Sequence, residues 1–123
     1  MQRIRILVVD DHEIVRRCIC EMLAGGSDIE VVCDASDGYE AVRKAGEFQP
    51  DVVLLDMTMP VMSGEETFRK LRGIRPDIKV ILSSGYNEAE AVRNFSGKGL
   101  AGFVQKPYTS ARLAEAISSV LTR

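Results

Sequence analysis

The chain has 123 residues, of which 46% are hydrophobic and 28% are charged, and its formal net charge is −2. This length suits one globular domain, so we expect residues 1–123 to form a single folded unit. The near-neutral charge gives no electrostatic basis for direct nucleic-acid binding, and no apolar stretch approaches the ~20 residues of a membrane span. The first residues lack the apolar segment of a signal peptide, so we expect a cytoplasmic protein without membrane insertion.

Apolar runs and helix-period patterns alternate along the sequence. Strands are predicted at about 3–9, 29–33, 51–55, 78–82 and 101–104. Helices are predicted at about 12–23, from a cap at Ser36 and Asp37 to Pro50, and then at 64–74, 87–95 and 110–121. In the first helix the spacing predicts an inward face of Val15, Cys18, Ile19, Met22 and Leu23, and in the second one of Ala41, Val42, Ala45 and Phe48.

Five strand–helix units with short connections predict an open parallel sheet covered by helices on both faces. We therefore expect an α/β, doubly wound, flavodoxin-like (βα)5 fold with strand order 2-1-3-4-5. Ligands bind such sheets beyond the carboxyl ends of the strands, where the strand order changes direction. The sequence thus predicts a site at that edge of the sheet.

Polar side chains with related chemistry end four of the five strands. They are Asp10 and Asp11, then Asp56, then Ser84, and finally Lys106. Carboxylates this close repel one another unless a cation intervenes, and Mg²⁺ accepts a few carboxylates while leaving room for phosphate oxygens. A lysine and a hydroxyl can bind phosphoryl oxygens, and an ionised carboxylate needs no base to act as a nucleophile. The set predicts Mg²⁺-dependent phosphoryl transfer to Asp56, with Mn²⁺ as a substitute ion.

The ordered motifs resemble the receiver domain of two-component signalling, and the resemblance covers essentially the whole chain. Its marks are Val8-Val9-Asp10-Asp11, then Leu54-Leu55-Asp56-Met57-Thr58-Met59-Pro60, Gly64, Ser84-Gly85, and Phe103-Val104-Gln105-Lys106-Pro107. The spacings of 28 residues from Asp56 to Ser84 and 22 from Ser84 to Lys106 are usual in that family. They favour Ser84 over Ser83 as the phosphoryl contact, with Ser83 one step back and pointing to the other side.

The resemblance implies a role for each acidic position. Asp56 is expected to be phosphorylated by a histidine kinase or a histidine phosphotransfer protein. Asp11 and Asp56 are expected to bind Mg²⁺ directly, Asp10 through water, and Thr58 through its backbone carbonyl. Thr58 and Tyr86 would flank the approach of water and so modulate hydrolysis of the acyl phosphate, with Tyr86 shielding it.

The resemblance also implies a switch. Lys106 would pair with the phosphoryl group, and its bond to Pro107 is expected to be cis. Ser84 would move toward the phosphoryl oxygens while Phe103 rotates inward. Phe103 stands where tyrosine is commoner in the family, which removes a hydroxyl. The face formed by 87–95, 101–104 and 110–121 would then change shape and present itself to an output domain or target protein.

Several alternatives remain at this point. An aspartyl-phosphate phosphatase would want a second acid at position 58, which is Thr58, and a flavin-binding module would want hydroxyls where Asp10 and Asp11 stand. A degenerate, binding-only receiver is a third alternative. We expect a phosphoacceptor module rather than an enzyme. His12, at a predicted helix start, is interpreted as a surface or capping residue, and the three cysteines as reduced thiols.

The biological setting is predicted from two halves that differ. Residues 10–17 look like receivers joined to a helix-turn-helix DNA-binding domain, whereas residues 81–87 and 97–103 look like receivers of hybrid sensor kinases. The longer match favours the hybrid origin, with a DNA-binding response regulator as the alternative. Because the sequence stops soon after its last predicted helix, we expect either a stand-alone receiver or one cut from a longer protein.

Overall fold

The computed structural model of the chain describes residues 3–24, 28–56, 64–84, 101–105 and 108–121. The strands are β1 (Ile4–Val9), β2 (Ile29–Ala35), β3 (Val52–Asp56), β4 (Lys79–Ser84) and β5 (Gly102–Gln105). The helices are α1 (Glu13–Ala24), α2 (Gly38–Phe48), α3 (Gly64–Ile74) and α5 (Ser110–Leu121). The helix predicted at 87–95 lies outside the described residues. None of the described helices is long and apolar enough to cross a membrane.

The strands form one parallel sheet in the order β2-β1-β3-β4-β5. This confirms the expected doubly wound topology, in which β1 and β3 are neighbours and the chain direction across the sheet switches between them. Both central strands are almost fully buried. Their continuous apolar runs are required because helices cover both faces.

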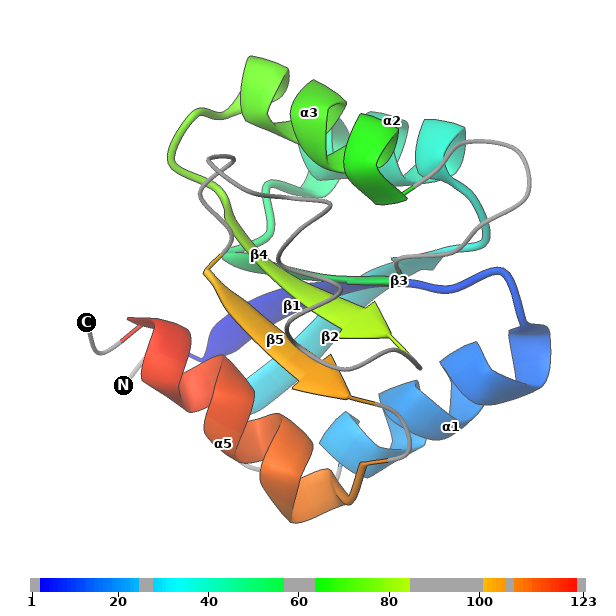
Figure 1. Cartoon of the computed structure of the whole chain (residues 1–123), viewed down its shortest axis with the longest axis vertical. Helices are drawn as coiled ribbons and strands as arrows, with labels where there is room; N and C mark the ends of the chain where they lie inside the picture. Colours follow the sequence, from blue (N-terminus) through cyan, green and yellow to red (C-terminus); the bar gives the residue numbers. More distant parts are fainter. Residues whose placement is uncertain (1–2, 25–27, 57–63, 85–100, 106–107, 122–123) are drawn as a thin grey trace.

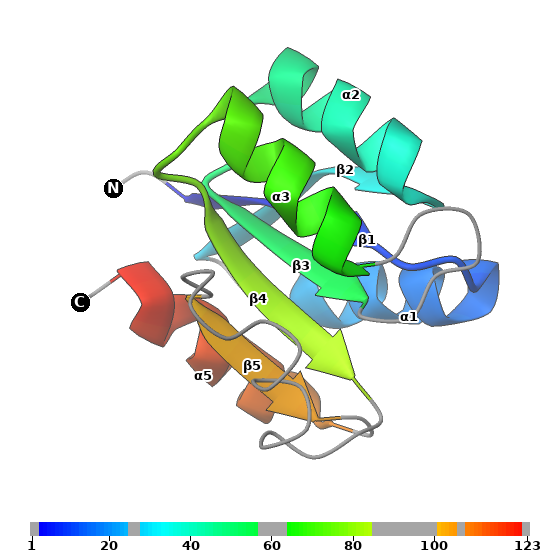
Figure 2. The same ribbon diagram turned by 45° about the horizontal axis from the view of Figure 1, so that its top comes forward.

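Two layers of helices sandwich the sheet. Figures 1 and 2 show α2 and α3 on one face and α1 and α5 on the other. Alternate strand residues feed two separate cores. Leu7, Val53 and Leu82 pack with Phe68 and Leu71 under α2 and α3, whereas the neighbouring strand positions pack with Leu113 and Ile117 under α5. These two cores fix the position of the strand ends.

The predicted cap of α2 is confirmed at Asp37. Its backbone is extended, as is usual for an N-cap residue. Its carboxylate accepts the N–H of Glu40 at 2.8 Å and so satisfies one of the free donors of the first turn. Glu40 reaches back to the N–H of Ser36 at 2.9 Å. The helix ends at Gln49, whose left-handed φ of 51° lets its N–H bond the carbonyl of Ala45.

The predicted inward faces of α1 and α2 are partly wrong. Ile19 and Leu23 are buried, but Val15 is 38% exposed and Cys18 is exposed as well. The buried stripe of α1 instead continues through half-buried Cys20 and Arg16, because the Arg16 guanidinium turns inward to bond β2. In α2, Ala41 and Ala45 are buried as predicted, whereas Phe48, on the last turn, is 37% exposed.

Candidate functional site

The carboxyl ends of β1 and β3 hold two buried carboxylates at the same level. Asp56 is the last residue of β3 and is 6% exposed, and Asp10 follows β1 directly and is 1% exposed. Val9 and Leu55, the residues just before them, are paired across the two strands. The register therefore carries Asp10 and Asp56 side by side to the rim of the sheet.

Asp10 also fixes the turn from β1 into α1. Its Oδ1 accepts the backbone N–H of His12 at 2.9 Å, and its own N–H donates to the carbonyl of Ala35 at 3.1 Å. The carbonyl of His12 accepts the N–H of Arg16 at 2.8 Å, so His12 caps the helix, as its position in the sequence predicts. Asp10 is thus held by β2 on one side and by α1 on the other.

Unlike Asp10, Asp11 has one carboxylate oxygen that accepts no hydrogen bond. Its Oδ1 is buried and has no hydrogen-bond partner. Nδ1 of His12 lies 3.2 Å from this oxygen and 3.6 Å from Oδ1 of Asp10. A buried carboxylate oxygen without a donor is costly in a folded protein unless a cation satisfies it. The residues present therefore fit a divalent ion at this position.

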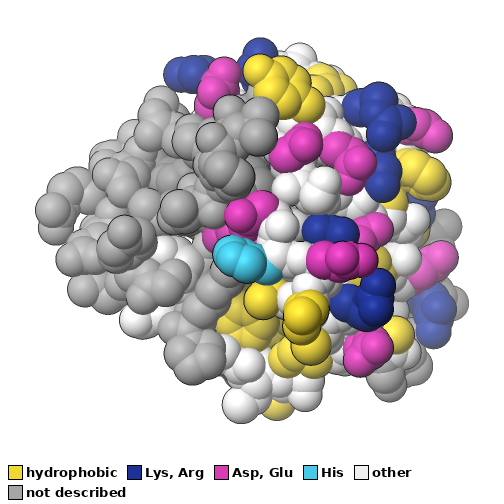
Figure 3. All heavy atoms as spheres, turned by 90° about the vertical axis from the view of Figure 1, so that its right-hand side faces the viewer, with side chains coloured by type: hydrophobic (Ala, Val, Ile, Leu, Met, Phe, Trp, Pro, Cys, Tyr) yellow, Lys and Arg dark blue, Asp and Glu magenta, His cyan; other side chains and the backbone are white. Residues whose placement is uncertain are grey.

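Within the described part of the chain, the potential metal ligands that lie within 4.8 Å of one another are Asp10, Asp11 and His12. Asp56 is not in this group, although the register brings its strand end next to Asp10. Figure 3 shows the imidazole at the surface with acidic side chains beside it. The sequence predicted the acidic pair at this place, but His12 was interpreted as a surface or capping residue and not as a further potential ligand.

The two serines of β4 are arranged differently from the sequence expectation. Ser83 is paired with Asp56 across the strands, and Ser84 is paired with Gln105. Because side chains alternate along a strand, Ser83 shares a face of the sheet with Asp56, whereas Ser84 lies on the other face. Both are 2% exposed, and Oγ of Ser83 has no hydrogen-bond partner. The expectation that Ser83 points to the side away from Asp56 is therefore wrong.

Phe103 lies on β5 opposite Leu82 of β4. Its side chain is partly buried and packs against the core under α2 and α3. It is thus neither fully exposed nor fully buried. The other predicted site residues, which are Thr58, Tyr86, Lys106 and Pro107, lie outside the described residues.

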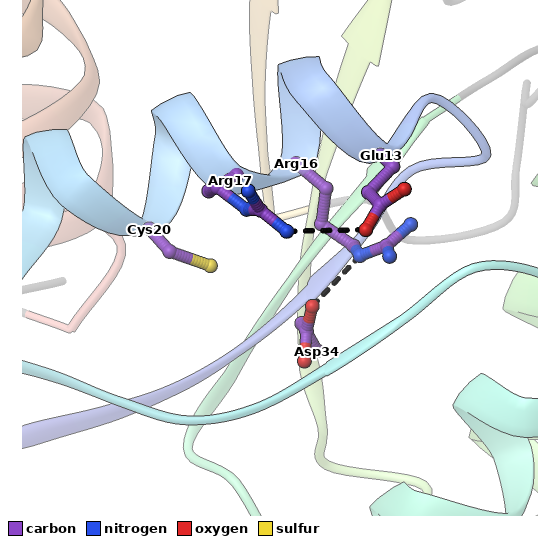
Figure 4. Close-up of a pocket in the computed structure, with 5 residues that line it drawn as sticks. All are labelled: Glu13, Arg16, Arg17, Cys20 and Asp34. Carbon is purple, nitrogen blue, oxygen red and sulfur yellow. Dashed lines mark hydrogen bonds and ion pairs between the residues drawn. The ribbon is translucent and has the colours of Figure 1, made fainter.

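Arg16 is a supporting residue that sequence reasoning missed. Its Nη1 donates to the backbone carbonyl of Asp10 at 2.9 Å, and its Nε donates to Oδ2 of Asp34 at 2.7 Å. Only 16% of its side chain is exposed. Figure 4 shows Arg16 reaching from α1 toward Asp34, while Arg17 pairs with Glu13 along the helix. These residues and Cys20 line a shallow pocket of about 370 Å³.

The same support continues from β2 into α2. Nζ of Lys44 donates to the backbone carbonyl of Asp34 at 2.6 Å and lies 3.8 Å from Oε1 of Glu40. A chain of polar contacts thus connects α2, β2, α1 and the backbone of Asp10. One feature of the sequence could have predicted these contacts: Arg16 and Lys44 lie on the helices before and after β2, which carries Asp34. Such combinations of charged residues are, however, common on solvated surfaces.

The thiols of Cys20 and Cys33, which lie near the polar contacts of Arg16 and Lys44, are poor nucleophiles. Burial raises the pKa of the Cys20 thiol, and nearby Asp34 raises that pKa further. Burial likewise raises the pKa of the Cys33 thiol. All three cysteines are free, as predicted, with Cys18 exposed. Since the thiolate is the reactive form, neither half-buried cysteine has the environment of a catalytic residue.

Comparison with known proteins identifies the family. A family model described as the response regulator receiver domain matches residues 6–118. This chain belongs to the receiver domains of two-component systems. The response regulator GacA of Pseudomonas viridiflava is 42% identical over 117 residues, which are 95% of this chain and 55% of GacA. The chemotaxis protein CheY of Listeria monocytogenes is 38% identical over 114 residues, which are 93% of this chain and 95% of CheY.

Solved structures agree with this assignment. The receiver domain of the response regulator NarL from Mycobacterium tuberculosis superposes with a TM-score of 0.90 at 30% identity, covering 100% of both chains. Receiver domains are phosphorylated by histidine kinases, attach to output domains and bind Mg²⁺ at an acidic pocket. The chain spans about half the length of relatives such as GacA and nearly all of CheY.

Proposed function

We propose that Asp56 is the phosphoacceptor of this receiver. The proposal rests chiefly on one observation: a buried carboxylate ends the central strand β3, level with Asp10. In the transfer, an oxygen of Asp56 attacks the phosphorus of a phosphohistidine on a kinase or phosphotransfer protein. The new P–O bond forms as the P–N bond breaks, and its electron pair returns to the imidazole. The product is an acyl phosphate on Asp56.

The acidic pocket would hold a divalent ion during this step. A bound Mg²⁺ supplies positive charge that offsets the carboxylates and the phosphoryl oxygens. Asp11 and Asp56 are the proposed direct ligands, Asp10 acts through water, and the backbone carbonyl of Thr58 completes the protein ligands. The unpartnered Oδ1 of Asp11 supports a cation at this place. Lys106 is proposed to pair with the phosphoryl group.

The switch is proposed to run from β4 to β5. Ser84 contacts the phosphoryl oxygens after transfer, and Phe103 fills the space that Ser84 leaves. Supporting this, Phe103 is paired with Leu82 of β4, two residues before Ser84, and has only part of its ring buried. The surface of β5 and α5, together with residues 87–95, would then engage an output domain or target protein. Thr58 and Tyr86 would set the lifetime of the acyl phosphate.

Ser83 provides a control for the switch, since it is equally buried and lies across from Asp56. We expect Ser84→Ala to weaken the response of Phe103 to phosphorylation, measured by the ¹⁹F spectrum of a fluorinated phenylalanine at that position. Ser83→Ala should leave that response in place. The opposite result would make Ser83 the phosphoryl contact, in agreement with its position on the face of Asp56.

The setting favoured by the relatives is a response regulator. GacA is a two-component response regulator of which this chain spans about half, and CheY is a relative of nearly equal length. We propose that the module is itself no enzyme beyond promoting its own phosphorylation and dephosphorylation. The hybrid-kinase origin stays a prediction. Three free cysteines support a reducing compartment such as the cytoplasm.

Phosphoryl uptake from a small donor tests the proposed function. The intact mass of the chain is measured after incubation with acetyl phosphate and Mg²⁺, for wild type and for Asp56→Asn. We expect a gain of one phosphoryl group in the wild type that is lost with EDTA and lost in the variant. Asp51→Asn is a matched control, since Asp51 lies before β3 at the other end of that strand. Equal uptake by wild type and Asp56→Asn would refute the assignment.

A further inference from the structure

His12 is anchored next to the acidic pair by its own backbone. Its N–H donates to Oδ1 of Asp10 at 2.9 Å, and its carbonyl accepts the N–H of Arg16 at 2.8 Å. The side chain is 72% exposed, so the imidazole faces solvent rather than the core. The ring therefore occupies a defined place beside the carboxylates and remains accessible to an ion that enters from solvent.

The distances around Nδ1 of His12 match those between ligands of a metal ion. Nδ1 lies 3.2 Å from Oδ1 of Asp11 and 3.6 Å from Oδ1 of Asp10. Metal–ligand bonds of about 2.0–2.2 Å place neighbouring ligand atoms roughly 2.8–3.1 Å apart in octahedral geometry and roughly 3.3–3.6 Å apart in tetrahedral geometry. The two separations therefore lie within, or about 0.1 Å from, the values expected between two ligands of one ion. The three side chains thus converge without rearrangement of the backbone.

The closest pair of atoms is not joined by a hydrogen bond. Oδ1 of Asp11 is buried and has no hydrogen-bond partner, even though Nδ1 of His12 lies 3.2 Å away. The two side chains lie within ion-pair distance, but no hydrogen bond between them satisfies this oxygen. A cation between the two atoms would be bound by both of them. The buried oxygen and the imidazole therefore point to the same ligand.

We infer that His12 makes the acidic pocket a mixed nitrogen and oxygen site that prefers a borderline transition-metal dication over Mg²⁺. The inference rests on the proposed role of the pocket as the cation site of the receiver. Imidazole suits Zn²⁺ and its neighbours, whereas Mg²⁺ prefers carboxylate and water oxygens. His12 consequently adds a ligand for Zn²⁺ and contributes little to Mg²⁺. Asp11 contributes to the binding of both ions, because its oxygen is a ligand in either case.

Calorimetric titration of the whole chain with Zn²⁺ and, separately, with Mg²⁺ tests this preference. The variants are His12→Asn, which places a favourable helix-capping residue at this position, and Asp11→Asn, with thermal unfolding recorded for each to confirm folding. We expect His12→Asn to weaken Zn²⁺ binding about tenfold, or ~1.4 kcal/mol, and to change Mg²⁺ binding far less. Asp11→Asn should weaken both ions. The cysteines are identical in all three proteins, so any Zn²⁺ they bind cancels in the comparison.

Proton NMR supplies a second measurement that does not depend on affinity. His12 is the only histidine of the chain, so its ring resonances are assigned without ambiguity. We expect Zn²⁺ to shift them in the wild type and not in Asp11→Asn. Unchanged Zn²⁺ affinity in His12→Asn, with ring resonances that do not move, would overturn the inference. If the wild type bound neither Zn²⁺ nor Mg²⁺, the cation site of the proposed function would itself be wrong.

Discussion

Replacing Arg16 by methionine should destabilise the protein far more than the same change at Arg17. Methionine keeps an apolar stem of comparable length, so the substitution removes mainly the guanidinium. Arg16 is 84% buried by side chain and bonds two other segments, whereas Arg17 is 70% exposed and, among the described residues, pairs with Glu13 on its own helix. The two neighbouring arginines therefore form a matched pair for measurement.

The magnitude follows from the partners of each guanidinium. A charge-assisted hydrogen bond to a buried carbonyl, here that of Asp10, contributes about 1.5–3 kcal/mol. The pair with Asp34, whose side chain is 47% exposed, adds no more than ~1 kcal/mol because solvent screens it. The exposed pair of Arg17 is of the helical i,i+4 kind, which contributes about 0.3–0.5 kcal/mol. We expect a loss of about 2–3 kcal/mol for Arg16→Met and under ~0.5 kcal/mol for Arg17→Met.

Urea unfolding, followed by far-ultraviolet circular dichroism and extrapolated linearly to water, gives the free energy of unfolding of each variant. Equal slopes against urea would show that the unfolded states are comparable. If the two variants differed by less than ~0.5 kcal/mol, Arg16 would not be a structural link between α1 and β2. The Arg16 guanidinium would then not be the group that holds the backbone of Asp10 in place.

Three further predictions concern the core, a helix cap and thiol reactivity. Phe68→Ala, which empties a fully buried position, should cost about 3–5 kcal/mol in urea unfolding, whereas Phe48→Ala, at a partly exposed position, should cost clearly less. Asp37→Ala should cost about 1 kcal/mol through the lost cap of α2, measured the same way, and Asp37→Asn should recover most of it. Maleimide labelling followed by peptide mass spectrometry should modify exposed Cys18 before Cys33. Because burial raises the pKa of Cys33 above the ordinary thiol value of 9.0, its labelling rate should still be rising with pH at pH 9, and a plateau below that pH would contradict the assignment.

The raised thiol pKa also sets the sign of one pH effect on stability. A thiol whose pKa is higher in the folded state holds its proton when the unfolded chain has lost it, so unfolding becomes more favourable as pH rises. The contribution of Cys33 is therefore complete below about pH 9 and is lost as the pH rises through the higher folded pKa.

Much of the fold could be predicted because its signals are local. Apolar runs such as that ending at Asp56 identify buried strands, and parallel strands must end at one edge of the sheet. That geometry alone brings Asp10, Asp11 and Asp56 to the same edge of the sheet. The strand order then follows from short connections and helices on both faces. Asp37 was predictable as a cap because its side chain acts on the backbone three residues away.

The missed features depend on contacts between distant segments. The apolar spacing of α1 fits two adjacent stripes, and only the bonds of Arg16 to β2 and to Asp10 decide which of them faces the core. The pairing of Ser83 with Asp56 depends on the register of β3 and β4, which the composition of neither strand encodes. The convergence of His12 on Asp11 depends on the turn that Asp10 closes.

Direct location of the phosphoryl group tests whether Asp56 is the acceptor. After phosphorylation with acetyl phosphate and Mg²⁺, reduction of the acyl phosphate with borohydride converts the modified aspartate to homoserine, and peptide mass spectrometry locates it. We predict that homoserine replaces Asp56, the buried carboxylate at the end of β3. Homoserine at Asp10 or Asp11 instead would contradict the assignment of acceptor and ligands, and with it the proposed mechanism.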